Sequence, residues 1–337
     1  MPSKVVCRLV YKVRLALRLI FHHYFQRYTA GMNNNYYLCL DQGGTHSRAV
    51  VISERAEIIS QARVPVNHQR HHDGRVEQQP EQLLASLRDC ALQAVRQLTA
   101  MQRLQLTVCG LVCQRSSLLA WRNTDGAAIT PVLSWQDTRA HRLVPDTAQM
   151  LDTIQRLTGL RANAHFGASK MHYLLMHEPS VKKAANNKQL RLSPLASYLV
   201  YHLLSEKPYC IDVANGQRSL LMNVKDSDWD KQLLEHFAID RDFLPRIGKQ
   251  GGEICWGHLE VDGLRLPMTL LSGDQSAAVF SRGALLKNTV IINWGTGAFL
   301  LADVDNPDGT TLQATFKGIE AADSIAIDPH KGFFVSY

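Results

Sequence analysis

The chain has 337 residues, and at roughly 150 residues per domain this length predicts about two domains with room for a sizeable core. With 45% hydrophobic and 20% charged residues the composition is that of an ordinary globular protein, which excludes disordered, collagenous and disulfide-scaffold classes. No uncharged apolar stretch reaches the roughly 18 residues that a membrane-spanning helix needs.

The net charge of +7 is concentrated at the start of the chain. Residues 1–31 hold six basic side chains and no acidic one: Lys4, Arg8, Lys12, Arg14, Arg18 and Arg27. Without those six, 31 basic side chains stand against 30 acidic ones. The body of the protein is nearly neutral, so a nucleic-acid partner has little support.

Residues 1–35 form a basic N-terminal extension with two interpretations. Apolar residues between the basic ones give the pattern of a basic amphipathic helix, which suits membrane-surface docking or a transit peptide. Alternatively, translation starts at Met32, directly before the first expected strand. No small-residue cleavage site follows an uninterrupted apolar segment, which favours the start at Met32 and gives no firm membrane signal.

Seven cysteines occur, none in a C-x-x-C pair. An odd number does not suit a secreted disulfide framework, and we expect a cytoplasmic protein. Cys109 and Cys113, in T-V-C-G-L-V-C, share one face of an expected strand. No further ligands stand at metal-binding spacing, so we expect both thiols in the core.

The first expected elements are three short strands at 36–41, 49–52 and 57–64. A polar, His-rich loop follows at 67–73. Apolar residues at helical spacing then predict a helix from Pro80 to about Ala100, with Pro80 near its start.

Further strands are expected at 106–113, 118–121 and 131–135, the last two flanking the turn N-T-D-G. Helical patterns dominate 137–205, and short apolar pieces alternate with polar ones over 208–266. A new unit opens around Pro267 with M-T-L-L-S-G-D. Strands, then helices, then strands again indicate an α/β fold.

Two distant segments share one plan. L-C-L-D-Q-G-G-T-H-S-R-A-V-V (38–51) and I-I-N-W-G-T-G-A-F-L-L-A (291–302) both read as strand, Gly/Thr turn, strand. Glycine lets backbone N–H groups approach a phosphate closely, and threonine adds a hydroxyl. One such hairpin is more often a plain tight turn, but two facing each other would hold a polyphosphate between two domains.

Two aspartates complete the chemistry. Asp41 ends the first strand, where a carboxylate can hold Mg²⁺ through water beside nucleotide phosphates. Asp274, in S-G-D-Q-S-A-A-V-F, lies between an expected strand and helix. Phosphoryl transfer to an alcohol needs a base, a metal and donors for the phosphoryl oxygens, and this constellation supplies all three.

From Tyr36 to Tyr337 the sequence resembles the FGGY family of carbohydrate kinases, most closely its glycerol kinase branch. The resemblance rests on seven motifs in the family's order: D-Q-G-G-T-H-S-R-A-V-V, G-R-V-E-Q-Q-P, C-Q-R-S-S, L-S-W-Q-D-T-R, D-V-A-N-G-Q-R-S, G-D-Q-S-A-A and W-G-T-G-A-F. It implies a ribonuclease-H-like, actin-type ATPase domain over 36–271, followed by the start of a second such domain over 272–337.

The resemblance also implies roles for individual residues. Asp274 matches the catalytic base and Asp41 the aspartate associated with Mg²⁺. The first phosphate loop of the family is matched by Gly44, Thr45 and Arg48. The second is matched by Gly295, Thr296 and Gly297. The sugar or polyol pocket is matched by Gln114, Arg115, Trp135, His165, Gln275 and Phe299. ATP and Mg²⁺ are the implied cofactors.

Plainer interpretations stand beside these roles. Arg48 and Arg115 could form ordinary salt bridges, although their motifs favour the site, and Trp135 and Phe299 suit the core about equally well. Asp137 and Arg139 could pair with each other structurally. A polar loop with histidines is usually solvated, so a metal cluster of His68, His71 and His72 has little support.

Two departures from the family limit the substrate and the activity. Glycerol kinases carry Glu where Ser116 stands and Tyr where His165 stands, so the pocket is expected to be roomier and less anionic, and a larger polyol or ketose fits at least as well as glycerol. The chain ends at G-F-F-V-S-Y, before the family's adenine-binding segments. We therefore expect an impaired kinase or, alternatively, a non-catalytic sugar-binding or regulatory protein; the oligomeric state stays open, a homo-oligomer included.

Overall fold

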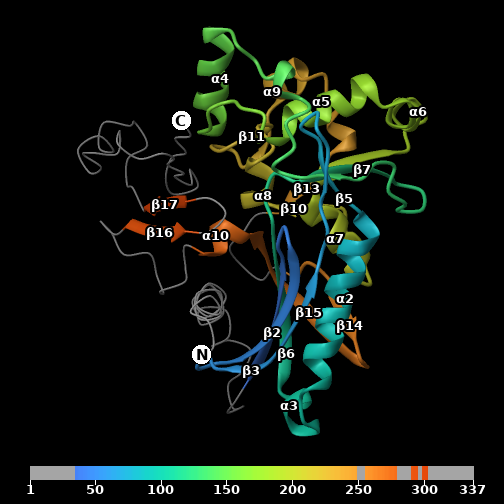
Figure 1. The fold of residues 1–337 in the computed structure, drawn as a ribbon, viewed down its shortest axis with the longest axis vertical. Helices are drawn as coiled ribbons and strands as arrows, with labels where there is room; N and C mark the ends of the chain where they lie inside the picture. Colours follow the sequence, from blue (N-terminus) through green and yellow to red (C-terminus); the bar gives the residue numbers. More distant parts are fainter. Residues whose placement is uncertain (1–34, 249–254, 279–289, 295–297, 303–337) are drawn as a thin grey trace.

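A computed structural model describes residues 35–248, 255–278, 290–294 and 298–302 of the protein. Its largest sheet has six strands in the order β14-β15-β6-β1-β2-β3 (Figure 1). The strands are β1 (Tyr36–Gln42), β2 (His46–Ser53), β3 (Ile58–Pro65), β6 (Leu106–Cys113), β14 (His258–Val261) and β15 (Leu264–Gly273). Strands β1, β6 and β15 run parallel, while β2, β3 and β14 are antiparallel to their neighbours.

Side chains along β1 point alternately to the two faces of this sheet, and both faces are buried. Leu38 and Leu40 face one side and join the main core, whereas Tyr37 and Cys39 face the other side in a smaller cluster. Helix α2 (Pro80–Arg96) covers the main-core side, packing across β1, β2 and β3. Its proline occupies the first turn, where a missing N–H costs nothing.

The sequence predicts most of these elements, with two differences. The expected helix from Pro80 to about Ala100 ends at Arg96, because Thr99 caps a separate helix, α3 (Ala100–Leu104), through a capping box with Gln102. The unit expected to open around Pro267 does not open there. Strand β15 begins before that proline and pairs with β6 in the first sheet.

A second sheet of five strands has the order β4-β5-β8-β7-β9. Its members are β4 (Gln69–Arg70), β5 (Val76–Gln78), β8 (Val132–Leu133), β7 (Leu118–Arg122) and β9 (Leu190–Pro194). Strand β9 interrupts the region predicted as helical, which otherwise holds α4 (Ala148–Thr158), α5 (Gly167–His177), α6 (Pro179–Asn186) and α7 (Leu195–Leu203).

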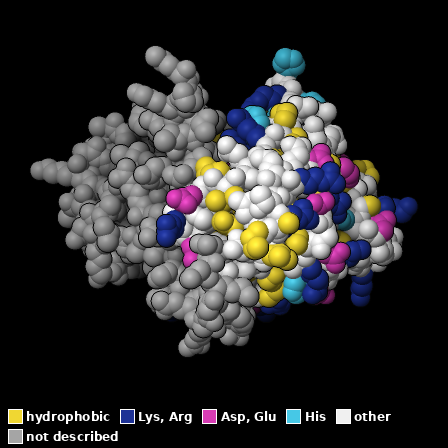
Figure 2. All heavy atoms as spheres, turned by 90° about the horizontal axis from the view of Figure 1, so that it is seen from below, with side chains coloured by type: hydrophobic (Ala, Val, Ile, Leu, Met, Phe, Trp, Pro, Cys, Tyr) yellow, Lys and Arg dark blue, Asp and Glu magenta, His cyan; other side chains and the backbone are white. Residues whose placement is uncertain are grey.

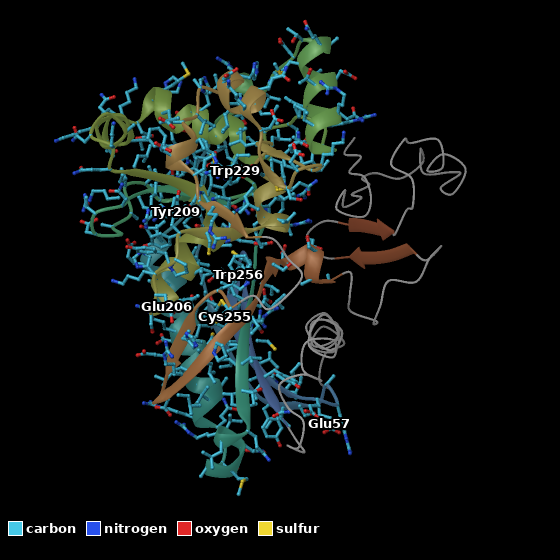
Figure 3. The ribbon with its side chains drawn as sticks, turned by 180° about the vertical axis from the view of Figure 1, so that it is seen from behind. Glu57, Glu206, Tyr209, Trp229, Cys255 and Trp256 are labelled. Atoms are coloured by element: carbon cyan, nitrogen blue, oxygen red, sulfur yellow. The ribbon has the colours of Figure 1, made fainter. Side chains whose placement is uncertain are left out.

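Smaller elements complete this part of the fold: α8 (Val213–Gln217), α9 (Lys231–His236), α10 (Asp274–Ala278), the pair β10 (Cys210–Asp212) and β13 (Arg246–Gly248), and the pair β11 (Met222–Asn223) and β12 (Asp228–Trp229). Short 3-10 turns lie at His141–Leu143 and Arg241–Phe243. Aromatic groups tie the connecting loops together (Figure 3): Trp229 Nε1 donates to the Pro245 carbonyl at 2.7 Å, and the Tyr209 hydroxyl donates to the Phe243 carbonyl.

The two hairpins with a shared sequence plan both form. Strands β1 and β2 pair up to Gln42 and Ser47, and β16 (Val290–Trp294) and β17 (Ala298–Ala302) pair up to Trp294 and Ala298. The turn of the second hairpin, Gly295, Thr296 and Gly297, lies outside the described residues. How the two hairpins face each other stays a prediction.

Three further expectations concern burial and the surface. Cys109 and Cys113 are fully buried, which confirms their place in the core. Among the described side chains in the view from below, basic and acidic groups are interspersed (Figure 2). Within the described ranges, no helix has the length and apolar character to cross a bilayer.

Candidate functional site

The candidate site lies where the three parallel strands end side by side. Gln42 of β1 is in register with Cys113 of β6, which is in register with Gly273 of β15. The chain therefore carries Asp41, Gln114 and Asp274 to one edge of the sheet. The carboxyl edge of parallel strands is where open α/β sheets bind their ligands.

Arg115 and Asp274 approach each other at this edge. Arg115 Nε lies 3.9 Å from Asp274 Oδ1, and another guanidinium nitrogen donates to Ser276 Oγ at 3.1 Å. The Arg115 side chain is 3% exposed, whereas that of Asp274 is 31% exposed. The Gln275 N–H donates to Asp274 Oδ1 at 2.7 Å. The carboxylate predicted as the base is thus held from two sides yet open to solvent.

The β1–β2 turn carries the residues of the first predicted phosphate loop. The Gly43 N–H donates to the His46 carbonyl at 3.0 Å, which closes the turn and leaves Thr45 exposed. Arg48 lies 3.5 Å from Asp41 across the hairpin. Burial lowers the pKa of Arg48, and Asp41 opposes that shift. An arginine and a carboxylate therefore stand together beside the turn.

Two glutamines connect this turn to the predicted sugar pocket. Gln78 Nε2 donates to the Gly44 carbonyl at 2.9 Å, and Gln114 Nε2 donates to Gln78 Oε1 at 2.7 Å. Gln114 Oε1 and His68 Nε2 are buried and have no hydrogen-bond partner among the described residues. Both atoms lie within 4 Å of the point where a Cβ on Gly44 would stand.

Trp135 and His165 form the aromatic side of the predicted pocket. Their ring centroids are 5.5 Å apart, and the His165 ring also meets Phe166 edge-on. Burial lowers the pKa of His165 well below its usual range, and the charges of Arg218, Lys170 and Arg115 lower it further. The imidazole is therefore neutral and offers one donor and one acceptor.

A buried ion-pair network begins two residues after Trp135 in the chain. Arg139 binds both Asp137, at 2.8 Å, and Glu77, at 2.5 Å, while Asp137 also accepts the Val76 N–H at 2.8 Å. The expected structural pairing of Asp137 with Arg139 is confirmed. Each carboxylate has a partner, as buried charge requires.

Three carboxylates gather around the end of β6. Burial raises the pKa of the Cys113 thiol, and the charges of Asp274, Asp212 and Asp41 raise it further. Asp212, which caps α8 by accepting the Asn215 N–H, is itself fully buried. Burial raises the pKa of Asp212 to about 6 against the opposing hydrogen bonds from Asn215.

The histidine loop is largely exposed to solvent, as the sequence predicts. His71 and His72 are exposed, with His71 3.6 Å from Glu77, whereas His68 is half-buried and turns one ring nitrogen into the interior beside Gly44. Within the parts of the chain that the structure describes, no group of three or more His, Cys, Asp or Glu side chains could hold a metal ion.

The structure does not describe the side chains of several predicted site residues. Gly295, Thr296 and Gly297 are outside the described residues, and only the backbone of Phe299 is described, in β17 opposite Asn293. Sequence reasoning in turn missed Gln78, Ser276 and Lys170, and it considered His68 only as a candidate metal ligand. Lys170 lies at helical spacing from Leu174 on α5, a position that indicates the interior.

Comparison with known proteins identifies the class. A model of the FGGY family of carbohydrate kinases, N-terminal domain, matches residues 36–281, so the chain belongs to this family. The relatives that it matches include glycerol kinases: the enzyme of Aromatoleum aromaticum is 32% identical over 269 residues, and that of Thermococcus kodakarensis is 31% identical over 274 residues. These alignments cover 79% and 80% of this chain but 54% and 53% of the relatives, so the chain spans about half their length.

Solved structures agree on the fold. A glycerol kinase of Plasmodium falciparum with ADP superposes with a TM-score of 0.71 at 22% identity, covering 79% of this chain and 54% of that one. A ligand-bound xylulose kinase of Lactobacillus acidophilus gives 0.66 at 16% identity, covering 78% and 53%. The expected α/β fold of actin-type ATPases is confirmed.

Proposed function

We propose that this protein transfers a phosphoryl group from ATP to a hydroxyl of a sugar or polyol. The observation that carries the proposal is Asp274 at the carboxyl edge of the sheet, beside Arg115 and on the same edge as Asp41. A partly exposed carboxylate there can accept the proton of a hydroxyl as that oxygen attacks phosphorus.

The substrate would bind between Arg115, Gln114, Gln275 and the Trp135–His165 wall. Each hydroxyl removed from water needs a replacement hydrogen bond, and this wall supplies both donors and acceptors. Neutral His165 offers one of each. With Ser116 in place of a carboxylate, we favour a polyol or ketose larger than glycerol.

The nucleotide would bind with its phosphates at the two Gly/Thr hairpins. Gly44, Thr45 and Arg48 come from the first hairpin, and Gly295, Thr296 and Gly297 from the second. The Arg48 guanidinium would offset charge on the migrating phosphoryl group. The Plasmodium falciparum relative was solved with ADP, which supports ATP as the phosphoryl donor.

Asp41 would associate with Mg²⁺, which neutralises phosphate charge when bound. The residues fit this ion because Mg²⁺ keeps several waters and is usually held by one or two carboxylates together with substrate phosphates. Asp41 is a half-buried carboxylate beside the phosphate turn, and its partner Arg48 is 3.5 Å away. A full protein cage is not needed.

The proposal is tested with the 337-residue chain by calorimetry and by a coupled assay of ADP release, across a panel of polyols and ketoses. We expect saturable sugar binding and ADP release that depends on the sugar. ADP release measured without sugar serves as the blank. Sugar binding without ATP binding would instead support the non-catalytic sugar-binding protein. A folded chain that neither binds nor phosphorylates any panel member contradicts both.

A further inference from the structure

The fully buried side chain of Lys170 is not explained by the roles given so far. Lysine is almost never enclosed completely, because removing an ammonium group from water costs several kcal/mol unless it is paired. Helix α5 nevertheless turns this side chain into the main core, on the same helix face as Leu174.

The ammonium group ends among three backbone carbonyls. Lys170 Nζ donates to Ser116 O at 2.9 Å, to Ser134 O at 3.1 Å and to His165 O at 3.1 Å. An ammonium has three N–H donors, so the three carbonyls use all of them. Three segments far apart in sequence are thereby fastened to one atom.

Those three segments are the ones that carry the proposed sugar pocket. Ser116 follows Arg115 directly and has a left-handed backbone with φ of 63°. Ser134 precedes Trp135, whose own N–H donates to Ser117 Oγ at 3.0 Å. His165 is itself a pocket residue. The bonds of Lys170 therefore fix the backbone beside one cationic and two aromatic groups of the pocket.

We infer that Lys170 is the positioning residue of the sugar pocket, holding Arg115, Trp135 and His165 in register through the carbonyls beside them. It touches no substrate; it acts through the three segments. The expected effect of Lys170 on sugar affinity rests on the proposed function. The expected effect on the order of the three backbone segments does not depend on it.

Burial among these carbonyls makes the charge of the lysine sensitive to pH. Burial lowers the pKa of Lys170 to about 7, with Asp137 opposing the shift and Arg139 adding to it. Neutral His165 adds no charge. Above this pKa the amine keeps only two N–H donors, so one carbonyl loses its partner. Sugar affinity should therefore fall as the pH rises through about 7.

The test compares the wild-type chain with Lys170→Met, which keeps the length of the side chain and removes every donor. Sugar dissociation constants are measured by calorimetry from pH 6 to 9, with the best-binding panel polyol or ketose. We expect at least tenfold weaker binding in K170M, an unchanged dissociation constant for ATP, and loss of the pH dependence. Lys170→Arg, which keeps charge and donors, should recover part of the affinity.

Tyr209→Phe is the matched control, because it removes a part-buried hydroxyl whose acceptor, the Phe243 carbonyl, belongs to none of the three segments that Lys170 bonds. It should lower the unfolding midpoint and leave sugar affinity within twofold. A lysine with only a structural role would behave in the same way, reducing the folded fraction without changing the dissociation constant. Sugar affinity in K170M within twofold of wild type would overturn the inference.

Hydrogen exchange separates a failure of the proposed function from a failure of the role inferred for Lys170. In K170M, amides of residues 113–118, 132–137 and 163–168 should exchange faster, while those of β3 stay unchanged. This readout needs no sugar, so a wild-type chain that binds none contradicts the proposed function alone. Amide exchange that accelerates equally in all segments, or in none, contradicts the role of Lys170. If K170M does not fold, a flat pH profile of sugar affinity in the wild-type chain contradicts it instead.

Discussion

The stem of Arg115 lies directly against Gly273, so closely that a Cβ on the glycine would stand 2.3 Å from Arg115 Cδ and 2.5 Å from Cγ. Gly273 ends β15 and precedes Asp274. The missing side chain is what allows the arginine to cross the strand end and reach the carboxylate. Two motifs about 160 residues apart, C-Q-R-S-S and G-D-Q-S-A-A, are fitted together at this contact.

Gly273→Ala should therefore damage the site more than the fold. The new methyl group forces Arg115 aside, with an overpacking cost of about 1–3 kcal/mol. We expect sugar affinity to fall at least tenfold, measured by calorimetry. Gly216→Ala is the control, because its Cβ would meet only ordinary contacts of 3.5 Å and more. Equal affinities in the two variants would show that the Arg115 placement does not matter.

Gly44→Ala separates the phosphate loop from the fold. A Cβ at this position would have neighbours at 3.5–3.7 Å, which is ordinary contact, so stability should change by less than about 0.5 kcal/mol. A methyl group would nevertheless keep a phosphate oxygen away from the turn. We expect at least tenfold weaker ATP binding with unchanged sugar affinity. Unchanged ATP binding in this variant would remove the first hairpin from the nucleotide site.

Ser116→Gly should stabilise the protein while weakening the site. The φ of 63° is unfavourable for serine by about 1–2 kcal/mol and costs glycine nothing, although the greater freedom of glycine in the unfolded chain returns part of this. The Ser116 hydroxyl has no hydrogen-bond partner among the described residues, so its removal costs no hydrogen bond within this part of the structure. We expect a higher midpoint of urea unfolding and lower sugar affinity; Ser117→Ala, which removes the acceptor of the Trp135 N–H, should lower the midpoint.

Asp212→Asn should change the pH dependence of stability. Because burial raises the pKa of Asp212 to about 6 from its usual 3.8, the folded state binds more protons than the unfolded state between these values. Wild-type stability from this group is fully present below pH 4 and is lost as the pH rises through about 6, by about 3 kcal/mol.

Urea unfolding at pH 4, 5, 6 and 7 measures this loss. The asparagine side chain resembles the protonated form of Asp212, so the variant should be close to wild type in stability at pH 4 and gain on it steadily towards pH 7. A difference between the two proteins that stays constant over this range would show that Asp212 titrates normally.

The sequence predicts the strands that end at the site because each is an apolar run followed by a polar or glycine-containing segment. Asp41 and Asp274 follow from that pattern. Strand β9 does not, because five residues within a long helical pattern carry too little periodicity. Lys170 stands at an interior helical spacing from Leu174, but lysine as a residue type indicates solvent. The bond from Gln114 to Gln78 joins segments that only the folded sheet brings together. Contacts between distant segments, which sequence spacing does not encode, account for these omissions.

The most direct test of the central claim is phosphoryl transfer by Asp274→Asn, measured beside sugar affinity in the same preparation. Asparagine keeps the shape and the acceptor oxygen near Arg115 but cannot take up the hydroxyl proton at neutral pH. We expect sugar binding within about threefold of wild type and at least a hundredfold loss of the transfer rate. Transfer at a rate close to that of wild type would contradict the role of Asp274 as the base.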